Sequence, residues 1–174
     1  MARSSSAALP IAHMLLRILI LLNWLLAAAV LVLLLLMPTE RWIMTELALT
    51  PSPEAKRLVA GLRAIAVIGL VALPLNHLVL TRLLAMVGTV RVGDPFVAPN
   101  AQRLRTIAWA LLALQLIGLV IAAVAKAVSI PGRPPLDIDA GFSIAGWLAV
   151  LLAFVLARVF AEGARMREDL EGTI

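Results

Sequence analysis

The polar residues that could do chemistry in this chain lie inside long apolar stretches. Four of them carry amide or imidazole groups: Asn23, Asn76, His77 and Gln115. Polar groups buried in a membrane are costly, and they often mark the path of an ion, a proton or a ligand. Neutral amides also simply join neighbouring helices by hydrogen bonds, each contributing about 0.6–2 kcal/mol. Because these stretches contain no Asp, Glu, Lys or Arg, we expect helix packing and keep a ligand site as the alternative.

The depth of these residues predicts where they lie relative to one another. At a rise of 1.5 Å per residue, Asn23, Asn76 and His77 lie roughly 8–9 Å inside the same membrane boundary, and Gln115 lies about 15 Å inside it. The first three are therefore expected to form a small polar layer. His77 is the only histidine among them. A lone histidine cannot form a metal site, which needs three or four ligands, so we predict no metal.

Motifs for enzymatic catalysis are missing from the sequence. It contains no recognisable Ser/His/Asp motif, no Gly-rich phosphate loop and no HExxH pair. Cysteine is absent, which excludes disulfides, thiolate ligands and cysteine nucleophiles. We therefore expect a protein that is not an enzyme, with no catalytic residue and no cofactor.

The composition places the chain in a lipid bilayer. Hydrophobic residues make up 63% and charged residues 14%, against about 45–50% and about 25% in soluble domains. All charged residues lie outside four windows, 18–37, 64–81, 106–125 and 140–157, and each window is long enough as a helix to cross a hydrocarbon layer of roughly 30 Å. We predict an all-α integral membrane four-helix bundle, a single membrane domain over residues 1–174, with a helical tail over 158–171.

Local signals predict where two of these helices begin. Ser52 is a suitable N-cap because Pro53 and Glu54 follow it, and this helix is expected to run to about residue 90. Asn100, which follows Pro99, is the expected N-cap of the third helix. The apolar run near the N-terminus exceeds the 7–15 residues of a cleaved signal peptide, which favours a retained membrane anchor.

The distribution of basic residues predicts the orientation in the membrane. The N-terminus, the second loop and the C-terminus together carry nine Lys and Arg residues, and the other face carries six. Because retained positive charge marks the cytoplasmic face, we expect both termini in the cytoplasm, with the second and fourth helices extending into it. Topology then accounts for the net charge of +5 without any direct contact to nucleic acid.

The fourth window contains a ladder of alanines with a strict spacing of four residues. Its members are Ala145, Ala149, Ala153 and Ala157. Small residues at this spacing let membrane helices approach closely. Packing within the chain is the expected role, and a homo-oligomer or a partner in a larger membrane complex remains the alternative.

Two segments on the predicted cytoplasmic side have complementary charge. Residues 82–105 carry four arginines and one acid, whereas residues 158–171 carry four acids and three arginines. These segments are expected either to pack on each other or to form together a docking surface for a soluble partner. The candidate docking residues are Gly93, Pro95, Phe96, Asn100, Arg103, Arg105, Val159, Phe160, Glu162, Gly163, Arg167 and Glu168.

The same two segments resemble a bacterial family of small four-span membrane proteins of unknown function. The family pattern of the second loop is matched by Gly93, Pro95, Phe96, Asn100, Leu104 and Arg105. Its C-terminal pattern is matched by Val159, Phe160, Gly163, Arg167, Glu168 and Thr173, with Ile174 in place of a valine. The resemblance extends over nearly the whole chain.

Proteins of this family are often encoded beside a small helix-turn-helix regulator. The resemblance therefore implies a regulatory or tethering partner of a cytoplasmic protein, in the bacterial cytoplasmic membrane. A small transporter, a channel or a binder of lipophilic ligands that uses the intramembrane polar residues is the alternative. The third hypothesis is a structural subunit of a membrane complex that uses the alanine ladder.

Overall fold

Four long helices account for most of the described residues in the computed structural model. The structure describes residues 5–36, 43, 45–46, 50, 52–91, 93, 96–129 and 141–171. The helices are α1 (Ser5–Leu36), α3 (Pro53–Arg91), α4 (Ala98–Val128) and α5 (Ile144–Glu171). All four are long and apolar enough to cross a membrane. The prediction of an all-helical protein with four spans is therefore confirmed.

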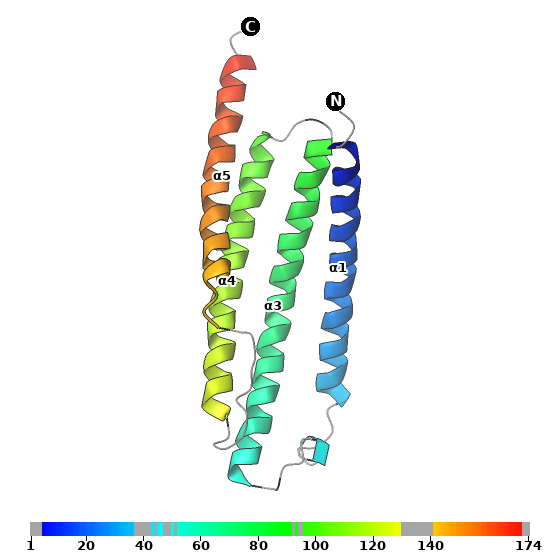
Figure 1. Ribbon diagram of the computed structural model, residues 1–174, viewed down its shortest axis with the longest axis vertical. Helices are drawn as coiled ribbons and strands as arrows, with labels where there is room; N and C mark the ends of the chain where they lie inside the picture. The colour runs from blue at the N-terminus through cyan, green and yellow to red at the C-terminus, as the bar shows by residue number, and fades with distance from the viewer. Residues whose placement is uncertain are drawn as a thin grey trace.

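Successive helices run in opposite directions, so that both chain termini lie at the same end of the molecule (Figure 1). We call this the terminal end; it contains the starts of α1 and α4 and the ends of α3 and α5. α3 has 39 residues, which corresponds to about 58 Å, nearly twice the thickness of the hydrocarbon layer. The last turns of α5 rise beyond the start of α4 at the terminal end (Figure 1).

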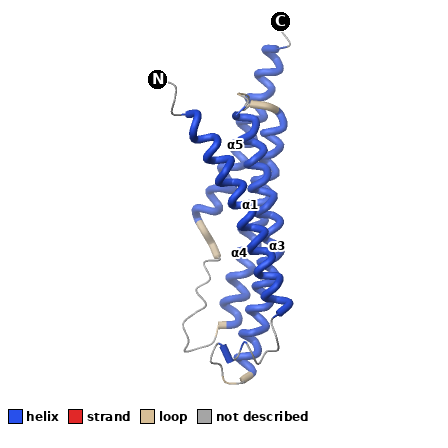
Figure 2. The backbone as a smooth tube through the Cα atoms, turned by 90° about the vertical axis from the view of Figure 1, so that its right-hand side faces the viewer, coloured by secondary structure: helices blue, strands red, loops and turns tan. Residues whose placement is uncertain are grey.

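The four helices of the predicted bundle form an open row. α1 packs on α3, α3 on α4 and α4 on α5, and in the described ranges the two outer helices contact no other helix. Figure 1 shows the helices side by side, and in Figure 2, turned by 90°, they overlap one behind another. Most large apolar side chains of α1 are exposed. Lipid covers such side chains as well as protein does, so no hydrophobic driving force closes the row.

The helix α3 begins as predicted, but α4 does not. The Ser52 hydroxyl accepts a hydrogen bond from the Ala55 N–H at 3.1 Å, which confirms Ser52 as an N-cap. In α4 the N-cap is Val97, without a side-chain hydrogen bond, and Asn100 already lies in the first turn. Pro99 fits at an early helical position because it needs no donor there, and so the helix starts before Asn100.

Small residues set the closest approach between helices. A Cβ atom on Gly61 of α3 would lie 2.6 Å from the Val128 methyl carbons of α4. Further along the same pair, Val79 packs against Ile107 and Ala110. The interior of the row is therefore thin, and its contacts are concentrated along narrow stripes of adjacent helices.

Candidate functional site

The two segments that carry the family resemblance meet at the terminal end. The ring of Phe96, just before α4, lies 5.1 Å from the ring of Phe160 on α5, centroid to centroid. Gly163, one turn further along α5, leaves room for the same ring, since a Cβ there would lie 2.9 Å from Phe96 Cδ1. The second loop and the C-terminal helix thus form one continuous surface.

Asn100 joins α3 and α4 below this surface. It is fully buried, with 0% of its area exposed. Its amide nitrogen donates to the Thr89 hydroxyl at 2.7 Å, and its amide oxygen accepts from Arg103 Nη1 at 2.7 Å. The Thr89 hydroxyl donates in turn to the Met86 carbonyl. Asn100 is therefore placed to hold the loop in position, and it is not accessible to a partner.

α5 contributes two exposed apolar side chains to the terminal end. Val159 and Met166 are 53% and 57% exposed, and their spacing of seven residues puts them on one face of the helix. Exposed charged docking residues named from the sequence are Arg105, Glu162, Arg167 and Glu168. Gly93 lies in a turn with φ of +90°, a conformation that suits glycine, and Pro95 lies outside the described residues. We call Phe96, Val159, Phe160, Gly163 and Met166 the terminal surface.

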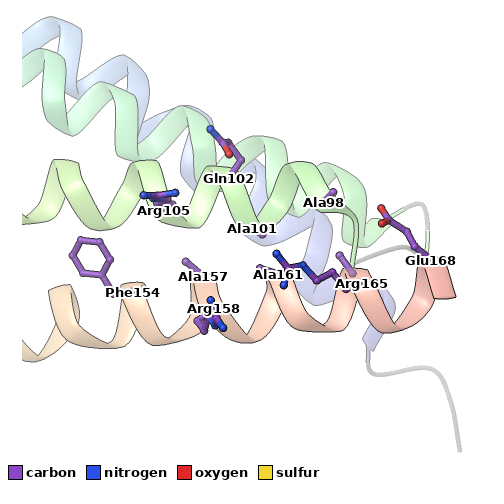
Figure 3. A pocket seen from close by; sticks show the side chains of 11 residues that line it. Ala98, Ala101, Gln102, Arg105, Phe154, Ala157, Arg158, Ala161, Arg165 and Glu168 are labelled. Carbon is purple, nitrogen blue, oxygen red and sulfur yellow. The ribbon is translucent and has the colours of Figure 1, made fainter.

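A groove of about 590 Å³ lies beside this surface, between α4 and α5 (Figure 3). Its charged residues are Arg105 on α4 and Arg158, Arg165 and Glu168 on α5. The rest of the lining consists of Ala98, Ala101, Gln102, Phe154, Ala157, Ala161 and Ala164. The sequence singled out only part of this set, because a groove between two helices depends on their relative rotation.

Two of the four intramembrane polar residues pair with each other between α1 and α3. The Asn76 amide nitrogen donates to the Asn23 side-chain oxygen at 2.9 Å, and the Asn23 nitrogen donates to the Leu73 carbonyl at 3.3 Å. Asn23 is only 5% exposed. This pairing is the interhelical hydrogen bonding that the sequence favours over a ligand site.

The other two polar residues lie in different surroundings. The His77 ring lies against Trp24, with ring centroids 5.2 Å apart, and His77 Nδ1 is buried without a hydrogen bond in the part of the chain that the structure describes. Gln115 packs on α5 instead, where its amide occupies the space that a Cβ on Gly146 would fill. The four residues are thus divided between two separate interfaces and do not converge on one cavity.

The alanine ladder is only partly used for packing. Ala153 and Ala157 are buried, at 7% and 8% exposure, whereas Ala145 and Ala149 are exposed. A spacing of four residues turns by about 40° per step around a helix of 3.6 residues per turn. The early members of the ladder therefore rotate away from α4.

No group of three or more His, Asp or Glu side chains that could hold a metal ion occurs among the described residues. Charged side chains of the described ranges lie toward both ends of the helices, with Glu54, Lys56 and Lys126 at the end opposite the termini. At the terminal end, charged side chains line the groove between α4 and α5. Of the intramembrane polar residues, Asn23 and Asn76 join α1 to α3 by a hydrogen bond.

These features define the protein as a multi-pass helical membrane protein with an open row of four spanning helices. The chain belongs to the family described as "Protein of unknown function (DUF2975)", whose pattern matches residues 42–174. This match includes α3, α4 and α5 and begins after α1. No curated protein and no solved structure matches the chain.

Proposed function

We propose that this protein is a non-enzymatic membrane anchor in the bacterial cytoplasmic membrane that binds a cytoplasmic regulator at its terminal end. A small helix-turn-helix protein is the partner that the family resemblance favours. The charged segments 82–105 and 158–171 both belong to this end. The observation that carries the proposal is the packing of Phe96 on Phe160 and Gly163, because it joins both family segments into one surface.

The length of α5 supports a docking role for its last turns. α5 has 28 residues, and Arg158 ends its uncharged window. At the helical rise, Met166 lies roughly 12 Å beyond Arg158, outside the hydrocarbon layer. Its 57% exposed side chain is therefore available to a soluble protein.

The distribution of basic residues supports a cytoplasmic location for the terminal end, where the proposed partner binds. The N-terminus, the second loop and the C-terminus carry nine Lys and Arg residues in the sequence, against six on the other face, and positive charge is retained in the cytoplasm. The terminal surface then faces the compartment in which DNA-binding regulators act. The chain itself needs no contact to nucleic acid in this arrangement.

The proposal is tested with a surface charge that leaves the packing intact. Met166→Glu places a carboxylate on the exposed face of α5, and we expect it to release the regulator and change expression of the regulator's target genes in the native host. Ser129→Glu is the matched control, because Ser129 is exposed at the opposite end. Transcript profiles of the two variants and the wild type give the measurement, with membrane fractions showing equal amounts of protein.

Deleting residues 159–174 provides a stronger change with the same readout. We expect a transcript profile like that of Met166→Glu. If both variants accumulate normally in the membrane and both leave transcripts and partner binding unchanged, the proposed function is wrong.

A further inference from the structure

The groove between α4 and α5 lies at the height of the lipid headgroups. Arg105 directly precedes the uncharged window 106–125, and Arg158 directly follows the window 140–157. Since α4 and α5 run in opposite directions, these two window ends meet in the same groove. Phe154 extends the groove about one turn toward the hydrocarbon layer, and Arg165 extends it about two turns outward.

The groove has positive charge that the protein does not neutralise. In the described ranges, neither Arg105 nor Arg158 makes an ion pair or a hydrogen bond. Arg165 lies 4.0 Å from Glu162 and is 71% exposed, which makes for a weak pair. Glu168 is the one acid among the lining residues. Figure 3 shows Arg105 on one helix and Arg158 and Arg165 on the other, on either side of the alanines.

Small side chains create the space between these arginines. Ala101 of α4 and Ala157, Ala161 and Ala164 of α5 line the groove. Its volume of about 590 Å³ is in the range of small-ligand sites. Arginine binds phosphate oxygens with geometrically matched, charge-assisted hydrogen bonds. The groove therefore has both the volume and the donors for a phosphate group.

We propose that this groove binds an anionic phospholipid, with its phosphate between Arg105 and Arg158. An acyl chain of the same lipid lies along Phe154 and Trp109, whose rings pack edge to face at 5.3 Å. Trp109 is 56% exposed, so this aromatic pair continues the groove into the lipid-facing surface. Basic pockets between membrane helices are typical sites for anionic headgroups.

The apolar continuation selects a lipid over a free phosphate ion. A phosphate ion uses only the arginines, whereas a lipid also covers Phe154 and Trp109. The proposal is independent of the regulator, because Val159 and Met166 of the terminal surface do not line the groove. Lipid binding can therefore be measured in the absence of any protein partner.

Fluorescence quenching of Trp109 by brominated lipids tests the proposal on the full-length chain. The other tryptophans are replaced (Trp24→Phe, Trp42→Phe and Trp147→Phe), and the protein is reconstituted in phosphatidylcholine vesicles. A minor fraction of the lipid is either dibromo-phosphatidylglycerol or dibromo-phosphatidylcholine. One arginine near an anionic surface changes affinity roughly five-fold, so we expect phosphatidylglycerol to be favoured about five-fold or more.

The variants locate that preference in the groove. Arg105→Gln with Arg158→Gln is expected to abolish it, whereas Arg105→Lys with Arg158→Lys keeps the charge and part of the preference. Arg82→Gln is the matched control, because Arg82 ends the uncharged window of α3 at the same boundary and does not line the groove. We expect Arg82→Gln to behave as the wild type.

Three results would overturn the proposal. Equal quenching by the two lipids in the single-tryptophan protein with both arginines in place excludes an anionic-lipid site, and this result does not depend on the folding of the arginine variants. An unchanged preference in Arg105→Gln with Arg158→Gln places the lipid elsewhere. If added inorganic phosphate removes the preference for phosphatidylglycerol, and sodium chloride of equal ionic strength does not, the groove is a site for free phosphate.

Discussion

Gly163 is the residue at which the two family segments depend on each other most directly. Its hydrogen side chain allows the Phe96 ring to lie on α5. The sequence draws attention to Gly163 only as part of a resemblance, because a glycine within a helix shows no sign of what packs on it. Asn100 is the converse case. Its place after Pro99 indicates an N-cap, whereas its burial and its bond to Thr89 depend on the position of α3.

Gly163→Val is expected to separate Phe96 from α5. Even a Cβ at position 163 would lie 2.9 Å from Phe96 Cδ1, and overpacking of this kind costs about 1–3 kcal/mol. The free energy of unfolding in mixed micelles with increasing SDS provides the measurement. Gly69→Val is the control, since nothing lies within 4 Å of a Cβ at Gly69. Equal losses in the two variants would show that the Phe96 contact contributes nothing.

The Asn23 and Asn76 side chains are expected to be coupled in stability. Their hydrogen bond of 2.9 Å joins α1 to α3, and such bonds contribute about 0.6–1.7 kcal/mol in membranes. A double-mutant cycle of Asn23→Ala and Asn76→Ala, measured by the same unfolding assay, gives the coupling energy. Additive effects of the two substitutions would mean that this pair does not hold α1 in the row.

Among the elements, α5 shows how a sequence pattern and a packing face differ. The alanines repeat every four residues, but the buried positions Val150, Ala153, Ala157 and Ala164 follow a mean spacing nearer to the helical repeat of 3.6. The sequence therefore predicts the helix and its small face, and the structure is needed for the rotation of that face. The other spans are apolar on all sides, so the rotation of each helix is set by contacts.

Ala153→Leu is expected to destabilise the α4–α5 pair by about 1–3 kcal/mol, because a larger side chain must enter a closely packed interface. Ala149→Leu is the matched control on the same helix, since Ala149 is exposed and a leucine there faces lipid. Unfolding free energies of the two variants are compared with that of the wild type. A larger loss for Ala149→Leu would place α4 on the other face of α5.

At the scale of the whole molecule, the uncharged windows predict the number, direction and approximate ends of the spans. The open row could not be predicted in this way, because lipid and protein are equally good surroundings for an apolar helix face. The row leaves α1 in contact with α3 alone in the described part of the chain. The family match begins after α1, so the matched region contains the α3–α4–α5 unit and both segments of the terminal surface.

The orientation of the molecule can be measured with single cysteines, because the chain contains none of its own. We expect Met166→Cys at the terminal end to be protected from a membrane-impermeant maleimide in intact cells. Ser129→Cys at the opposite end is expected to react. Both positions are exposed, so accessibility within the fold does not limit labelling. The reverse pattern would place the terminal surface outside the cytoplasm.

Photo-cross-linking from the terminal surface in the native host tests most directly whether a cytoplasmic regulator docks there. A photoreactive amino acid replaces Met166, and the matched control replaces Leu151, which is 60% exposed within the spanning part of α5. We predict that position 166 becomes linked to a soluble helix-turn-helix protein, identified by mass spectrometry, and that position 151 does not. If position 166 yields no soluble protein, or only the products seen at position 151, the terminal end is not a docking site for a cytoplasmic regulator.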